Sequence, residues 1–233
     1  MFLVGGTALS ALQLTEKRAR IIVEKLLQHY PYAETTLTHE SPWELFVGAI
    51  LASQCTDERV NKITPALFSE YPDPESMALA EIKAVEPIIR SCGLFRSKAK
   101  ALVGTAQQLV EHYDGRVPES EEALMALPGV GRKIANLIRG DAFGKQAVVV
   151  DTHCARISRL IGFTDSDKPP KIERDLMAIL PEEHWTLWGH LMVTHGRDLC
   201  KARCRLCFSC PIRAECRYGE ALDPSEAEEQ DCV

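Results

Sequence analysis

The sequence predicts an all-α protein of about ten short helices, because helix start signals recur along the whole chain. The short turns that join two alternating strands in a hairpin are absent. Only residues 147–150 resemble a strand, and four apolar residues can equally form a buried linker. A length of 233 residues with 45% apolar residues allows a buried core, while no apolar run approaches the ~18 residues of a membrane span.

The predicted helices begin after recognisable caps. The first is expected from about Thr15 to Gln28. The Ser-Pro-Trp-Glu sequence at residues 41–44 combines a capping box with a proline at the first helical position, and it precedes an apolar helix that reaches Leu51. Further helix starts follow along the chain, at Asp73, Ser97, Ser120, Pro169 and Pro181.

Neither end of the chain is predicted to be structured. Residues 1–14 lack the basic start of a signal peptide, so we expect a flexible extension there. Residues 219–233 are polar and acidic, which predicts a disordered tail. Five of the nine cysteines lie within residues 200–216, which favours a metal site in a reducing compartment, and we therefore expect a cytoplasmic protein.

The net charge of −6 argues at first against a nucleic-acid partner. However, residues 218–233 carry six acidic side chains and no Lys or Arg, so the rest of the chain balances 27 basic groups against 27 acidic ones. Three windows, 87–110, 123–140 and 199–214, contain basic side chains and no Asp or Glu, and the first of them includes Lys98. Such windows could converge on one face and bind phosphates, or they could be scattered solvated charges.

The segment Leu-Pro-Gly-Val-Gly-Arg-Lys at residues 127–133 lies between two predicted helices. Its proline and its glycines Gly129 and Gly131 favour a tight turn, and Gly131 would let a ligand approach the backbone closely. The free N–H groups and the positive dipole end of the next helix could face a phosphate, beside Arg132, with no acidic residue nearby in the sequence. An ordinary turn between two helices is the alternative.

Two further residues have the character of catalytic groups. Lys133 falls on the first turn of the helix after the turn, where the dipole and a partly dry pocket would favour its neutral amine. Asp151 is expected at a helix N-cap, where backbone N–H groups keep a carboxylate ionised. A neutral amine and a carboxylate suit nucleophilic catalysis. For each residue alone, a surface lysine and an ordinary cap are the alternatives.

The cysteine cluster has the spacing of a metal site. Cys200, Cys207, Cys210 and Cys216 follow the pattern C-x6-C-x2-C-x5-C, which fits a 4Fe–4S cluster. Structural zinc, which usually uses two cysteine pairs separated by a longer finger, is the less favoured alternative. Cys204 opens a second, ferredoxin-like frame with Cys207 and Cys210.

Together these motifs resemble the endonuclease III family of the helix–hairpin–helix DNA glycosylase superfamily. The Gly/Pro-rich hairpin is followed by an aspartate within residues 149–153, and similar segments occur at 51–57, 93–99 and 195–197 as well as in the cysteine cluster. The resemblance covers roughly residues 15–220.

The resemblance implies a DNA glycosylase and abasic-site lyase that acts on oxidised pyrimidines in duplex DNA. Lys133 would attack C1′ of a flipped nucleotide, while Asp151 would stabilise the positive charge that develops on the sugar. The resulting Schiff base would allow β-elimination and cleavage 3′ to the abasic site. Gln54 and Leu94 would fill the gap in the duplex from opposite sides, although a capping Gln and a core Leu are the simpler readings of these two residues alone.

The resemblance also selects the four cysteines named first as ligands of one 4Fe–4S cluster and leaves Cys204 spare. The cluster would hold a basic loop between the first two ligands, whose side chains Lys201, Arg203 and Arg205 could contact phosphates. Its expected role is structural, with no direct part in cleavage.

The implied architecture has two helical domains with the active site in a cleft between them. One domain, residues 35–145, is a bundle that ends in the helix–hairpin–helix. The other joins residues 15–34 to the cluster-bearing residues 146–218. We expect a monomer without membrane contact, of bacterial type and associated with the nucleoid.

Two other functions stay open. An adenine-specific mismatch glycosylase would share the fold and the cluster, but its catalytic Glu would fall between Val47 and Ile50, where this chain has no acidic residue. That family also lacks the hairpin lysine and carries a large C-terminal domain. A non-catalytic DNA-binding module or an electron carrier would not need both Lys133 and Asp151.

Overall fold

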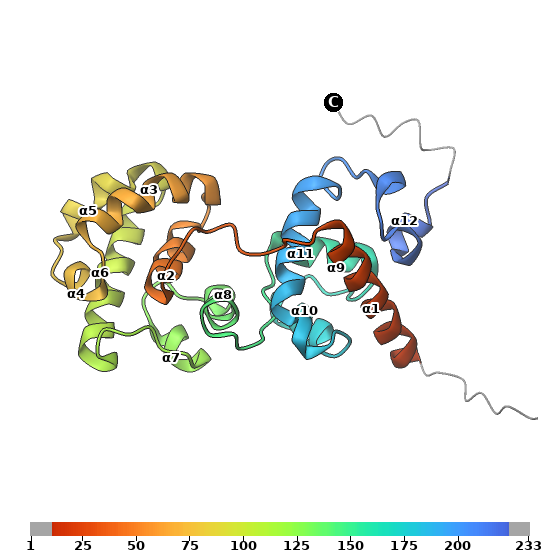
Figure 1. Ribbon diagram of the computed structural model, residues 1–233, viewed down its shortest axis with the longest axis horizontal. Coiled ribbons are helices and arrows are strands. Elements are labelled where there is room, and N and C mark those ends of the chain that lie inside the picture. The colour runs from red at the N-terminus through yellow and green to blue at the C-terminus, as the bar shows by residue number, and fades with distance from the viewer. Residues whose placement is uncertain (1–10, 224–233) are drawn as a thin grey trace, which may run out of the picture. The chain divides into compact units, whose positions relative to one another are not determined.

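The computed structural model describes residues 11–223, and it confirms the all-α fold class. Twelve α-helices occur in this range, and its only strand-like feature is an isolated bridge between Cys200 and Arg205. None of the helices in residues 11–223 has the length and apolar character required to cross a membrane. The contacts divide the described chain into two compact units, which Figure 1 shows and which are described separately below.

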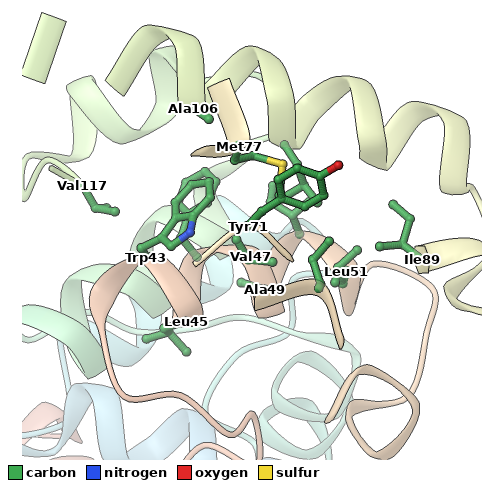
Figure 2. Close-up of a cluster of buried hydrophobic side chains, with 14 of the residues drawn as sticks. Trp43, Leu45, Val47, Ala49, Leu51, Tyr71, Met77, Ile89, Ala106 and Val117 are labelled. Carbon is green, nitrogen blue, oxygen red and sulfur yellow. The ribbon is translucent and has the colours of Figure 1, made fainter. Parts of the chain in front are cut away.

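The first unit, Thr35–Ala147, contains the predicted hairpin and is called the hairpin unit. Helix α2 is its centre, because every residue from Trp43 to Leu51 except Glu44 is buried. Figure 2 shows residues of α2 among Tyr71, Met77 and Ile89. The helices of this unit are α2 (Pro42–Leu51), α3 (Asp57–Glu70), α4 (Pro74–Ala78), α5 (Ile82–Ile89), the 3₁₀ turn η1 (Arg90–Cys92), α6 (Phe95–Tyr113), α7 (Glu121–Ala126) and α8 (Arg132–Phe143).

The second unit combines the described residues 11–34 and 148–223 and is called the cysteine unit. Its core surrounds Trp188, which is fully buried and donates a hydrogen bond from Nε1 to Ser158 Oγ at 3.3 Å. Its helices are α1 (Ala11–His29), α9 (Thr152–Ile161), α10 (Pro169–Met177), η2 (Glu182–His184), α11 (Trp185–Asp198), η3 (Cys207–Ser209), η4 (Arg213–Glu215) and α12 (Arg217–Glu220).

The predicted caps are partly confirmed. Ser120 caps α7, and Asp73 caps α4 through a complete capping box. Ser41 caps α2 by accepting from Glu44 N, but the Glu44 side chain accepts from Glu40 N, so the predicted capping box is only half formed. The predicted helix start at Ser97 is two residues late, because α6 begins at Phe95 without a side-chain cap.

The ends of the described chain are more ordered than predicted. Helix α1 begins at Ala11, so residues 11–14 are helical and do not belong to an extension. Gly219 lies in α12 and is buried against Arg213, whose guanidinium also donates to the carbonyl oxygen of Leu222. The predictions made for residues 1–10 and 224–233 fall outside the described residues.

Residues 147–150 form an extended linker and are not part of a strand. Ala147, Val148 and Val149 are buried, as the linker alternative predicted. Gly189 of α11 allows this close packing, since a Cβ there would lie 3.2 Å from Val149 Cβ. The linker ends directly at Asp151, so its burial fixes the start of α9.

Candidate functional site

The helix–hairpin–helix is formed by α7, the turn at residues 127–131 and α8, within the hairpin unit. Gly129 has φ +78°, and a Cβ at this position would lie 3.0 Å from Ala101 Cβ and 3.4 Å from Ile50 Cδ1. Thr105 Oγ1 donates to the carbonyl oxygen of Pro128 at 3.2 Å. The turn is therefore fixed against α6 and α2, and its tightest position requires glycine.

Gly131 has the opposite surroundings. It is exposed, it precedes α8 as the N-cap, and a Cβ there would meet nothing within 4 Å. The first turn of α8 is therefore open on this side. Backbone N–H groups at such a helix N-terminus can bind an anion such as a DNA phosphate.

Arg132 is not free of acidic neighbours, which corrects the expectation from the sequence. Its Nη1 lies 2.8 Å from Glu121 Oε1, and Arg139 Nη1 lies 3.2 Å from the other carboxylate oxygen. Glu121 is the first residue of α7, and the contact between α7 and α8 brings it to two arginines that are two turns apart on α8. Residues 123–140 thus contain no acidic residue in the sequence, but in the folded structure the carboxylate of Glu121 contacts two of their arginines.

Lys133 is the second residue of α8 and its side chain is exposed. An exposed amine next to the open hairpin is accessible to a large substrate.

Asp151 is the N-cap of α9 in the cysteine unit, as predicted. Its Oδ1 accepts a hydrogen bond from Cys154 N at 2.7 Å, and its side chain is half-buried. The hydrogen bond satisfies one of the free N–H groups at the start of α9 and fixes the orientation of the carboxylate. Burial, with the nearby Asp151 charge as a further cause, raises the pKa of the Cys154 thiol to about 12, so this thiol stays protonated.

Gln54 and Leu94 both occupy exposed turns of the hairpin unit. Leu94 is 53% exposed, which excludes the core alternative, and Thr56 is the N-cap of α3, so Gln54 is not the cap. Their φ angles are +53° and +47°, in the left-handed region that non-glycine residues rarely adopt. In the described chain, Asp114 at the end of α6 is the only other non-glycine residue with positive φ.

Lys98 is turned inward, contrary to the phosphate contact suggested by its basic window. It is 4% exposed, and its Nζ donates to the carbonyl oxygens of Leu51 and Cys92, both at 2.8 Å. Burial lowers the pKa of the Lys98 ammonium. No pattern in the sequence indicates this role, since a lysine in a basic helical window is normally solvated.

Four cysteines of the cysteine unit line one pocket, together with apolar side chains such as Ile157 and Leu199. Cys204 does not line this pocket, although it lies in the same loop. Burial raises the pKa values of three of the thiols, that of Cys210 to about 12, so they are poor thiolates until a metal binds them. The four that line the pocket are Cys200, Cys207, Cys210 and Cys216.

The four thiols that line this pocket are a possible set of metal ligands. In the described chain, no group of three or more His, Cys, Asp or Glu side chains is already arranged around a single metal ion. A tetrahedral zinc site needs its four ligands around one ion, while in a 4Fe–4S cluster the four thiolates bind different irons. Four cysteines around one pocket supply the ligand number that a 4Fe–4S cluster requires.

Polar groups also contact the cysteine sulfurs. Arg156 Nη1 lies 3.6 Å from Cys200 Sγ, and His195 Nε2 lies 3.6 Å from Cys210 Sγ. Tyr30 OH lies 3.1 Å from the other ring nitrogen of His195, whose pKa burial lowers to about 4, so its imidazole is neutral. His195 lies in the family-like segment 195–197, whose sequence alone indicates no role for the histidine.

In the loop from Cys200 to Cys207, two of the three side chains expected to contact phosphates are exposed. Lys201 and Arg203 are exposed. Arg205 is only half-exposed and folds back: its Nη2 donates to the Ala202 carbonyl oxygen at 3.2 Å, and its guanidinium lies 5.2 Å from the centre of the Tyr218 ring. Its contacts stabilise the loop, which makes it a weaker candidate for DNA.

The comparisons with known proteins agree with these features. Residues 47–182 match the model of the HhH-GPD superfamily base excision DNA repair proteins. Endonuclease III of Synechocystis sp. is 44% identical over 207 residues, which cover 88% of this chain and 94% of the relative. Endonuclease III of Bacillus subtilis is 37% identical over 90% of this chain and 96% of its own length.

A solved endonuclease III in a non-covalent complex with DNA has the same fold, with a TM-score of 0.83 and 39% identity over 88% of this chain and 96% of that chain. These relatives favour endonuclease III over the mismatch glycosylase and over a non-catalytic protein. The chain therefore belongs to the HhH-GPD superfamily of base excision DNA repair proteins and, within it, to the endonuclease III family of DNA glycosylases with abasic-site lyase activity.

Proposed function

We propose that this protein removes oxidised pyrimidines from duplex DNA and cuts the strand 3′ to the abasic site, with Lys133 as the nucleophile. The observation that carries this proposal is the exposed amine of Lys133 on the first turn of α8, directly after a hairpin whose N-terminal side is open. A flipped sugar is bulky, so its nucleophile has to be accessible from the surface.

The reaction follows from the chemistry of an amine at C1′. The Lys133 Nζ lone pair forms a bond to C1′ as the bond from C1′ to the base breaks, and the base leaves with its electron pair and is protonated. Loss of a proton from nitrogen and opening of the sugar ring then give a Schiff base. Removal of a C2′ proton expels the 3′ phosphate by β-elimination, and water releases the lysine.

The proposed role of Asp151 in this reaction is electrostatic. Its Oδ1 accepts the hydrogen bond from Cys154 N at the N-terminus of α9, which fixes the orientation of the carboxylate. We assign to it the stabilisation of positive charge on the sugar in the transition state and the acceptance of a proton from the attacking amine. Such electrostatic stabilisation is commonly a large part of a catalytic rate.

The DNA contacts divide into two groups. Gln54 and Leu94 fill the gap that the flipped nucleotide leaves, since Gln offers donors and an acceptor to the orphaned base and Leu can wedge between bases. Phosphates are contacted by the turn and the cysteine loop, through Gly129, Gly131, Arg132, Lys201 and Arg203. Phosphate contacts set position and salt dependence, and the gap-filling residues select the extruded nucleotide.

We assign a 4Fe–4S cluster to the pocket of four thiols. The cluster would be ligated by Cys200, Cys207, Cys210 and Cys216, and it supplies a rigid cross-link between distant parts of one loop. Holding Lys201 and Arg203 in place lowers the entropy lost when they meet DNA. We also propose that the protein acts as a monomer in the bacterial cytoplasm, at the nucleoid; the bacterial origin of its relatives supports the bacterial setting.

The decisive experiment is covalent trapping on DNA that contains an abasic site. Borohydride should reduce the Schiff base of the wild type to a stable adduct, and Lys133→Gln should form none, with its lyase rate lowered about 10⁴-fold or more. Trapping by Lys133→Gln at the wild-type level would exclude Lys133 as the nucleophile. A panel of duplexes with different oxidised pyrimidines, read under single-turnover conditions, then defines the substrate range.

A further inference from the structure

The two turns assigned to gap filling are built alike and lie close to the same buried side chain. Gln54 follows the end of α2 by three residues, and Leu94 follows the end of η1 by two. Each is exposed and has a left-handed backbone. Backbone of this kind costs free energy in a non-glycine residue and persists only where the surroundings fix it. Each turn must therefore be held by contacts with its surroundings.

Lys98 of α6 contacts both elements from which these turns emerge. Its Nζ donates to the carbonyl oxygen of Leu51, the last residue of α2, and to that of Cys92, the last residue of η1. Carbonyl groups in the last turn of a helix lack an intrahelical partner, and the negative end of the helix dipole favours a cation beside them. One ammonium thus satisfies two helix ends.

The backbone of Lys98 makes a third contact, since its N–H donates to the carbonyl oxygen of Leu94 at 3.0 Å. One residue is therefore bonded to the end of α2, to the end of η1 and to Leu94 itself. A side-chain hydrogen bond between Cys55 and Cys92 also joins the two turns, but a bond between two thiols is weak. The other backbone bonds of the turns are local: Ser53 N donates to the Ile50 oxygen at 3.3 Å, Cys55 N to the Ala52 oxygen at 3.1 Å, and Gly93 N to the Arg90 oxygen at 3.4 Å. None of these backbone bonds sets the separation between the turns.

We propose that Lys98 is a positioning residue for damaged duplex DNA, because its ammonium fixes the separation of the turns that carry Gln54 and Leu94. This inference rests on the proposed gap-filling roles of those two residues. Two side chains that enter one gap from opposite sides must be held at the correct spacing before binding. Preorganisation of this kind lowers the entropy lost on association.

The chemistry of the site favours this role over simple space filling. A methionine would occupy nearly the same volume without the cost of burying a charge. A lysine that is 4% exposed is rare, and here no carboxylate is among its hydrogen-bond partners. The ammonium is used because it can donate to carbonyl oxygens from two separate elements at once.

The test compares two duplexes that differ only in whether a gap has to be filled. One contains a tetrahydrofuran abasic analogue, which cannot form a Schiff base, and the other is undamaged. Lys98→Met should weaken binding to the abasic duplex about tenfold or more, while binding to the undamaged duplex, which needs only phosphate contacts, stays within about twofold. Lys83→Met, an exposed lysine of α5, is the matched control and should change neither affinity.

A double variant tests whether the effect passes through the turn. In a Leu94→Ala background, Lys98→Met should add much less than it does alone, because residues that act together are not additive. If Lys98→Met does not fold, Lys98→Arg replaces it, since its longer guanidinium would displace both turns and should lower the abasic affinity selectively.

Equal losses on both duplexes, or no loss on the abasic one, would overturn the inference and leave Lys98 as an ordinary structural residue. Full additivity with Leu94→Ala would do the same. A wild type that does not prefer the abasic duplex would instead contradict the proposed function itself, and the two failures are therefore distinguishable.

Discussion

Two hairpin glycines show how differently neighbouring positions depend on the same residue type. Gly129 combines a positive φ with close contacts to α2 and α6, so both backbone and space require glycine. Gly131 has an extended backbone and open surroundings, so the fold does not require glycine there. The absence of a side chain instead leaves space for a ligand. The sequence pattern predicts a tight turn at these two glycines, but only the structure shows that one is required by the fold and the other leaves space for a ligand.

The substitution Gly129→Ala should lower the free energy of unfolding. The left-handed backbone should cost the variant about 1–2 kcal/mol of unfolding free energy, and the approach to Ala101 adds to this loss. The control is Gly104→Ala in α6, whose Cβ would make an ordinary contact with Pro128 at 3.6 Å and should be neutral or stabilising. Urea denaturation of the three proteins measures the effect. Equal stability of Gly129→Ala and wild type would show that the turn adapts.

Charged residues show where prediction from the sequence ends. Residue type and spacing identified the hairpin, its lysine and the cap at Asp151. The side-chain partners of Arg132 and Lys98 could not be predicted, because they depend on which helix packs nearby. Glu121 comes to Arg132 only through the contact of α7 with α8, and Lys98 is buried only because two helix ends meet beside it.

At the scale of elements, helix starts were predictable where a side chain makes the cap. Ser41, Asp73 and Ser120 all accept from the third residue of their helices, which is a local interaction. Helix α6 has no such cap, since Leu94 precedes it with a left-handed backbone held by tertiary contacts. The predicted start of α6 was therefore two residues late because tertiary contacts, and not a local cap, hold the turn at Leu94.

The cysteine loop allows two alternative sets of cluster ligands, one that includes Cys200 and one that includes Cys204. Four cysteines line its pocket and Cys204 does not, so Cys200→Ser should lower the iron content well below about four per chain and reduce the visible absorption of the cluster. Cys204→Ser should keep both. The measurements are iron analysis and an absorption spectrum of each purified protein. Loss of iron in Cys204→Ser alone would assign the cluster to the ferredoxin-like frame.

At the scale of the whole molecule, the net charge conceals the distribution that matters for DNA. All of the −6 arises after Arg217, while the rest of the chain is neutral and carries three acid-free windows. The structure removes some of that basic surface, since Lys98 is buried and Glu121 contacts two arginines. The basic groups left exposed at the hairpin and on the cysteine loop are few, so the negative charge of the C-terminal segment should affect the affinity for DNA measurably.

The last prediction is therefore that removing residues 224–233 tightens non-specific DNA binding. The deletion takes away four acidic side chains and no basic one, which changes the net charge from −6 to −2. It spares Gly219 and Leu222, whose contacts with Arg213 are part of the cysteine unit. Repulsion between exposed charges and DNA is long-ranged only at low salt, where the Debye length is about 30 Å at 0.01 M.

The affinity for an undamaged duplex should therefore rise at low salt and converge with that of the wild type near 1 M, where the Debye length is about 3 Å. A full-length variant in which Glu226, Glu228 and Glu229 become Gln and Asp231 becomes Asn is the control, because it removes the same charge without shortening the chain. If charge is the cause, both proteins gain equally. A gain in the deletion alone would mean that the segment obstructs DNA sterically, and unchanged binding in both would show that its charge has no effect on DNA.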